Sequence, residues 1–332
     1  PESLEQGYGG GIIAFWDYSN AGSAAFTVRT GRLTPPGEGP VGAEVNFRNF
    51  ASAATATFTI YGTIGSDGYT FGNVVFSDAA TADHGTFTNI GGTVATGDGG
   101  NTQFYDNSTA AYGTFHNFGG SVPKANGGDV AFDSSANGGY AQFHNRPATV
   151  AGAYGGVTSF NNNPNRPPDT EPKGASAGFG TYINYGAMQS GQGGGGHTEF
   201  TAKYGNATAG NGKFINYGST LCDKSSAGHT IFSTSDNKPD IDFFPTAANG
   251  IFWNFPSMDK GAAAGFTEFA VYRSGNSPNV PTAGNGTFYN LGGNTAGAAG
   301  GYTVFKGTST AANATLIATG GTNEGPGGRI AF

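Results

Sequence analysis

Bulky apolar residues recur along this chain in two series that alternate strictly with each other. The first series consists of Phe26, Phe58, Phe87, Phe115, Phe143, Tyr182, Phe214, Phe252, Phe288 and Leu316. The second series consists of Phe15, Phe47, Phe76, Phe104, Phe132, Phe160, Phe200, Phe232, Phe269, Phe305 and Phe332. Between Phe76 and Phe160 the chain advances 11 residues from the second series to the first and 17 residues back, so one repeat is 28 residues long. A fixed period of this size is typical of solenoids and related repeat proteins.

The positions around each ring are restricted to a few residue types. A β-branched residue stands two positions before every member of the second series, and glycine stands four positions before every member except Phe47. Glycine or alanine stands two positions before each member of the first series. Asparagine follows two positions after seven of those rings, at Asn89, Asn117, Asn145, Asn184, Asn216, Asn254 and Asn290. Because residues two apart on a strand share a face, these side chains are expected to point inward with the rings.

This pattern predicts an all-β fold, a parallel β-helix or β-solenoid of about ten coils with about 28 residues per coil. Coils stacked about 4.8 Å apart place equivalent residues above one another. The rings then form a core ladder, represented by Phe76, Phe87, Phe104, Phe115, Phe132 and Phe143, and the asparagines form a ladder of hydrogen-bonded amides. The handedness of β-crossovers favours a right-handed helix. A β-propeller, with four to eight blades of four strands each, fits two strands per repeat poorly.

The repeat also predicts the domain organisation. Residues 1–8 are expected to form an N-terminal extension, and residues 9–332 a single solenoid domain. Insertions lengthen one corner of successive coils near residues 163–175, 234–246 and 271–281. Insertions at one corner stack into one lateral feature, so they are candidates for a recognition or subunit-contact surface, with tolerated surface loops as the alternative.

Composition narrows the possible partners. The net charge is −7 and the 15 lysines and arginines form no basic run, so no nucleic-acid partner is expected. No apolar stretch approaches the roughly 18 residues of a membrane-spanning helix. The one cysteine, Cys222, excludes an intrachain disulfide. The 27 phenylalanines and 15 tyrosines distinguish the chain from a disordered glycine-rich sequence.

Residues with catalytic or metal-binding chemistry are few. Asp17, Asp78 and Asp106 share one repeat position, where they suit either turn capping or a paired-carboxylate or calcium site. Two pairs of histidines occupy equivalent positions in adjacent coils, His116 with His144 and His197 with His229, but no third metal ligand accompanies either pair. We therefore expect no catalytic residues, no metal, no cofactor and no enzymatic activity.

The two ends of the repeat have nearly the same sequence. Residues 10–15 read GGIIAF and residues 327–332 read GGRIAF, in the same phase of the repeat. Either the chain is a piece of a longer passenger, or its ends contact neighbouring copies through Ile12, Ile13, Phe15, Ile330 and Phe332. Head-to-tail contacts that do not close produce a filament, so the expected partner is a second copy of the chain.

The strand unit GGxTxF followed by GTFxNxGG resembles the β-strand repeats of large bacterial secreted, autotransporter-type surface proteins, from about Gly9 to Phe332. That resemblance implies export, surface display, and an adhesive or matrix role, and it brings no catalytic residues. The expected function is a structural protein, secreted or on the cell surface, that assembles into a filament or surface fibre. An adhesin that binds glycans or other surface proteins and a polysaccharide-active β-helix enzyme are the alternatives.

Overall fold

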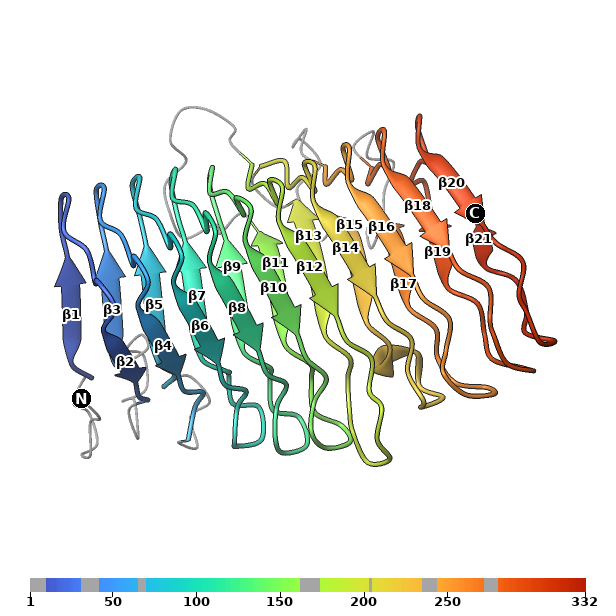
Figure 1. The fold of residues 1–332 in the computed structure, drawn as a ribbon, viewed down its shortest axis with the longest axis horizontal. Coiled ribbons are helices and arrows are strands. Elements are labelled where there is room, and N and C mark those ends of the chain that lie inside the picture. The colour runs from blue at the N-terminus through green and yellow to red at the C-terminus, as the bar shows by residue number, and fades with distance from the viewer. Residues whose placement is uncertain are drawn as a thin grey trace.

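The computed structural model describes residues 10–30, 42–64, 70–161, 174–202, 205–234, 244–271 and 280–332, and its strands lie side by side along one elongated rod (Figure 1). Successive strands alternate between two parallel sheets, so neighbours within a sheet are one turn of the chain apart. The prediction of an all-β parallel β-solenoid is confirmed. The only helix among the described residues is a short 3-10 turn, η1 (Lys224–Ser226).

The two sheets contain 11 and 10 strands. The 11-stranded sheet consists of β1 (Ile12–Phe15), β3 (Glu44–Phe47), β5 (Asn73–Phe76), β7 (Asn101–Phe104), β9 (Asp129–Phe132), β11 (Val157–Asn161), β13 (His197–Ala202), β15 (His229–Thr234), β17 (Phe266–Val271), β19 (Tyr302–Lys306) and β21 (Arg329–Ala331). The ten-stranded sheet consists of β2 (Ala25–Val28), β4 (Thr57–Ile60), β6 (Thr86–Asn89), β8 (Thr114–Asn117), β10 (Gln142–Asn145), β12 (Thr181–Asn184), β14 (Lys213–Asn216), β16 (Ile251–Asn254), β18 (Thr287–Asn290) and β20 (Thr315–Ala318). A column of single-residue parallel bridges, from Asn20 paired with Ser52 to Thr282 paired with Thr310, connects the turns along a third side.

The length of a turn varies along the rod. The predicted 28 residues hold for the central turns, whereas the average is about 32 residues because several turns carry insertions. Only some of the predicted ten coils therefore have the predicted length of 28 residues. The N-terminal extension, residues 1–8, lies outside the described residues. So does most of each predicted insertion, and these insertions follow β11, β15 and β17 in the chain.

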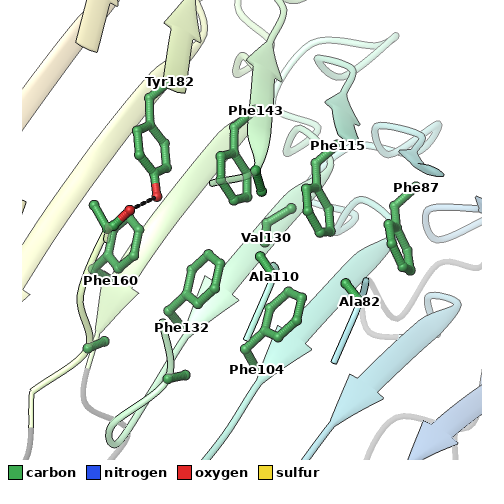
Figure 2. Packing of buried hydrophobic residues seen from close by; sticks show 14 of the residues in the cluster. Ala82, Phe87, Phe104, Ala110, Phe115, Val130, Phe132, Phe143, Phe160 and Tyr182 are labelled. Carbon is green, nitrogen blue, oxygen red and sulfur yellow. Dashed lines mark hydrogen bonds between the residues drawn. The ribbon is translucent and has the colours of Figure 1, made fainter. Parts of the chain in front are cut away.

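The rings of the two series fill the space between the two sheets, as Figure 2 shows. Phe76, Phe104 and Phe132 stack at centroid distances of 4.7–4.8 Å along the 11-stranded sheet. Phe87, Phe115 and Phe143 stack at 4.7–4.8 Å along the ten-stranded sheet. Rings of the two columns meet edge to face at 5.8 Å, and all six are fully buried. Both geometries are favourable for aromatic pairs, so the columns interlock and do not merely lie in parallel.

From Phe76 onward, the glycine four positions before each ring of the second series lies against the backbone of the opposite sheet. A Cβ atom at Gly156 would lie 2.5 Å from the carbonyl carbon of Asn117 and would overlap its oxygen. The same holds for Gly128 and Asn89, where the carbonyl carbon would be 2.6 Å away. Because backbone atoms cannot swing aside, the turns from β5 onward accept only glycine at this position, whereas the turn into β3 carries Ala43.

Candidate functional site

The seven predicted ladder asparagines end seven successive strands of the ten-stranded sheet and are fully buried. Each Nδ2 except that of Asn290, the last in the column, donates to the Oδ1 of the asparagine in the next turn at 2.8 Å. The bonds run from Asn89 to Asn117, Asn145, Asn184, Asn216, Asn254 and Asn290 in turn. Since a side-chain amide carries both a donor and an acceptor, a stacked column satisfies itself inside a dry core.

Threonine hydroxyls complete this column, a pairing that the sequence analysis missed. The β-branched residue 13 or 14 positions after each asparagine faces it across the core, and in six of the seven cases this residue is a threonine whose hydroxyl donates to the amide oxygen. Thr102 donates to Asn89 at 3.0 Å and Thr158 donates to Asn145 at 3.0 Å. The equivalent bonds from Thr198, Thr230, Thr267 and Thr303 measure 2.9–3.1 Å.

The sequence does carry a signal for this pairing. Where the first turns have Val28 and Ile60 in place of asparagine, the facing residues are Val45 and Val74, which have no hydroxyl. The exception is Asn117, which faces Val130 and donates to the carbonyl of Val157 at 2.8 Å. Apolar and polar residues therefore change together across the core.

The aspartates that share a repeat position occupy turns, and two of them accept hydrogen bonds from backbone N–H groups. Asp17, Asp78 and Asp106 have φ angles of 55–60°, in the left-handed region that aspartate tolerates better than most residues. The Asp78 carboxylate accepts from the backbone N–H of Asn49 at 3.0 Å, and the Asp106 carboxylate accepts from that of Asp78 at 3.1 Å. The carboxylates therefore hold consecutive turns together at one corner. No group of three or more His, Cys, Asp or Glu residues able to hold a metal ion occurs within the described ranges.

The two histidine pairs stack with ring centroids 5.0 Å apart. His116 and His144 are half-buried on the outer face of the ten-stranded sheet, and burial lowers the pKa of each imidazole. His229 continues its stack onto Phe266 at 4.7 Å. Burial, with His197 beside it, lowers the pKa of His229 to about 3, so this ring is neutral at physiological pH.

The outer face of the 11-stranded sheet contains a groove of about 420 Å³. Its floor follows one register line, in which Asn101, Asp129, Val157 and His197 are paired neighbours on β7, β9, β11 and β13. Glu199 stands two residues after His197 on the same face and also lines the groove. Four neighbouring strands of the sheet therefore build one continuous surface of polar side chains with a single apolar one, Val157.

The rim of the groove combines a turn carboxylate with aromatic rings. Asp98 precedes β7 and accepts from the Nδ2 of Asn126 at 2.7 Å. Tyr154 and Phe71 also line the groove. Burial raises the pKa of Asp98, against the lowering effect of the Asn126 hydrogen bond.

Asp129 is the most perturbed acid in the groove. Burial is the main cause and the nearby Glu199 carboxylate the second, and together they raise the pKa of Asp129 to about 8. A hydrogen bond from Ser159 at 3.3 Å opposes them, while Asp133 and Asp98 add to the rise. Asp129 is therefore mostly protonated at neutral pH.

We expect Asp129→Asn to flatten the pH dependence of stability between about pH 4 and pH 8. The raised folded-state pKa means that the folded protein keeps a proton that the unfolded chain releases in this window, so stability falls as pH rises through it. The slope is at most about 1.4 kcal/mol per pH unit, and is smaller because Asp129 is partly exposed. Urea unfolding at several pH values measures it, with Asp259→Asn as an exposed control. Parallel curves for wild type and Asp129→Asn would contradict the prediction.

The predicted subunit-contact residues lie at the two ends of the described rod. Strands β1 and β21 are the first and last of the 11-stranded sheet, and each pairs with one described strand. Ile12 is 70% exposed and Phe332 is 82% exposed, while Ile13 is also exposed. Phe15 and Ile330 are partly buried against the core. Ile13 and Phe332 thus leave exposed at the end faces apolar side chains whose equivalents, such as Val45 and Phe305, are buried within the rod, whereas Ile12 occupies an outward position equivalent to Glu44.

Comparisons with known proteins add no family to the fold class, so the chain is identified as a parallel β-solenoid and no further. A scan against protein-family models, a search of curated proteins and a search of solved structures each found no significant match. Within the described residues, no helix is long and apolar enough to cross a membrane.

Proposed function

We propose that this chain is a structural, non-catalytic extracellular protein whose solenoid is extended by head-to-tail stacking of copies into a filament or surface fibre. The observation that carries the proposal is the pair of end faces. Both leave a strand edge without a described neighbour and expose apolar groups that belong to the core ladders.

The ladders supply the complementarity that such stacking needs. The ring of Phe332 stacks on Phe305 at 5.0 Å and is 82% exposed. At the opposite end Phe15 stacks on Phe47 at 4.7 Å and is half-buried. A copy placed in register would continue the phenylalanine column and the parallel sheet together. Because this contact joins two different surfaces, it does not close on itself.

The proposed extracellular location rests on the sequence pattern within each repeat. The alternation of GGxTxF and GTFxNxGG units resembles the repeats of autotransporter-type bacterial surface proteins, which are exported and displayed. A low share of charged residues, 11%, and a rod built from ladders fit a matrix or fibre role.

Sedimentation velocity over a range of concentrations and negative-stain microscopy test the proposal. Wild-type protein is expected to form linear particles whose length grows with concentration. Ile13→Lys introduces a charge at one end face and Ile330→Lys does so at the other, and either is expected to shorten the particles to single rods.

Met258→Lys is the matched control, because Met258 is exposed on the side of the rod, away from both end faces. It is expected to leave assembly unchanged. Wild-type protein that remains monomeric at high concentration would overturn the proposal, as would equal disruption by Met258→Lys.

A further inference from the structure

The groove on the outer face of the 11-stranded sheet has unused hydrogen-bonding capacity. The Oδ1 of Asn101 is buried and has no hydrogen-bond partner among the described residues. Asn101 lies at one end of the groove floor, and His197, whose imidazole interacts with the backbone of Gly195, lies at the other. A buried polar atom without a partner costs about 1–3 kcal/mol, so the Asn101 oxygen calls for an explanation. A ligand that hydrogen-bonds to it supplies one.

The shape of the groove fits a linear ligand that lies along the rod. The floor residues Asn101, Asp129, Val157 and His197 are register partners on four adjacent strands, so they succeed one another about 4.8 Å apart along the axis. The floor is therefore about 14 Å long. A pyranose unit in an extended polysaccharide advances by nearly the same distance as one strand, so about three sugar units match the floor.

The chemistry of the lining selects a neutral, hydroxyl-rich ligand. Asn101 offers a carbonyl oxygen, and Asp98 and Glu199 offer carboxylates, so most groups accept hydrogen bonds. Asp129 in its protonated form also donates one. No lysine or arginine lines the groove among the described residues, so sulfated or uronate polymers meet no cation there. The proton of the Asp129 carboxyl finds an acceptor in a sugar hydroxyl but none in the ammonium groups of a polycation.

Aromatic side chains at the rim suit the apolar faces of sugar rings. Tyr154 is 57% exposed and stands at the edge of the groove. It differs from the exposed rings of Tyr112 and Tyr140, which stack on each other at 5.5 Å and cover one another's faces. No stacking partner for Tyr154 occurs within the described residues, so its face is available for contact. An amphipathic tyrosine at a polar groove supplies contact area at low entropic cost.

We propose that this groove is a binding site for a neutral, linear polysaccharide that runs along the rod axis across β7, β9, β11 and β13. The site does not depend on filament formation, because every residue of the groove comes from the middle of one chain. Acceptors on Asn101, Asp98 and Glu199 bind sugar hydroxyls, and Tyr154 contacts a ring face.

Titration of the full chain with neutral hexasaccharides of glucose, mannose and xylose, followed by calorimetry, tests the proposal. At least one of the three is expected to bind, and a polygalacturonate oligomer and a lysine oligomer are expected not to bind. Tyr154→Ala and Asn101→Leu are each expected to weaken binding about tenfold or more. Asn101→Leu is also expected to leave the urea midpoint unchanged or higher, since it removes an unpaired buried acceptor.

Tyr140→Ala is the matched control, because Tyr140 is also 57% exposed but lies at another corner of the rod. It is expected to change the affinity less than twofold. Absence of binding by all three neutral oligosaccharides at millimolar concentration would overturn the proposal. Preference for the lysine oligomer, or equal loss of affinity in Tyr140→Ala, would overturn it as well.

Discussion

Asn145→Leu is expected to destabilise the solenoid by about 3–6 kcal/mol, because it leaves several buried polar groups without a partner at about 1–3 kcal/mol each. Asn145 donates to Asn184 and to the carbonyl of His197, both at 2.8 Å. It accepts from Asn117 at 2.8 Å and from Thr158 at 3.0 Å. Leucine has a similar volume, so the loss reflects hydrogen bonds more than packing.

The control for this substitution is a second asparagine ladder on the surface. Asn249 donates to Asn211 at 3.3 Å and accepts from Asn285 at 3.4 Å, and all three are exposed. Water replaces these bonds, so Asn249→Leu is expected to change stability by less than about 0.5 kcal/mol. Urea unfolding followed by circular dichroism measures both variants. Equal midpoints would show that the buried column contributes little.

Gly156→Ala is expected to cost about 3 kcal/mol or more, although it adds one methyl group and removes no contact. Overpacking a core usually costs about 1–3 kcal/mol when side chains can move, and here the obstacle is backbone. The new Cβ would lie 2.5 Å from the carbonyl carbon and 2.9 Å from the Cβ of Asn117. To relieve this overlap, β8 and the turn before β11 would have to move apart. That movement would also strain the asparagine column.

Gly320→Ala provides the comparison, because a Cβ at Gly320 would meet no atom within 4 Å. It is expected to have little effect or to stabilise slightly by restricting the unfolded chain. Hydrogen exchange of the amides in β8 and β11, together with the urea midpoint, separates local from global effects. Unchanged protection in Gly156→Ala would mean that the turn yields more easily than its geometry indicates.

The inward-facing half of this structure could be read from the sequence. Each turn imposes the same constraint on a core position, so Phe115, Asn117 and Gly128 recur with their equivalents at a visible period. The same reasoning gave the fold class, which is confirmed. The turn length was less accurate, because insertions change the spacing without changing the register that the strands adopt.

The outer groove could not be read in the same way. Asp98, Asn101, Asp129 and Glu199 occupy outward positions that differ from turn to turn, so no period marks them. They come close together only because β7, β9, β11 and β13 pair in one register. In the sequence an insertion after β11 separates β13 from the other three strands. The threonine–asparagine pairing was readable in principle, but Val130 opposite Asn117 interrupts it, and the facing relationship follows only from the cross-section of the turn.

The buried asparagine column makes the interior of the rod electrically polar. From Asn89 to Asn254 every Nδ2 donates toward the following turn, so the amide dipoles add along the axis and each bond polarises the next. At the acceptor end, Asn89 receives the hydroxyl of Thr102. At the donor end, Ala318 follows Asn290 in the ladder, and the Nδ2 of Asn290 has no partner among the described residues. The column thus generates an internal field whose positive pole faces the C-terminal turns, in a protein whose ring stacks have no polarity of their own.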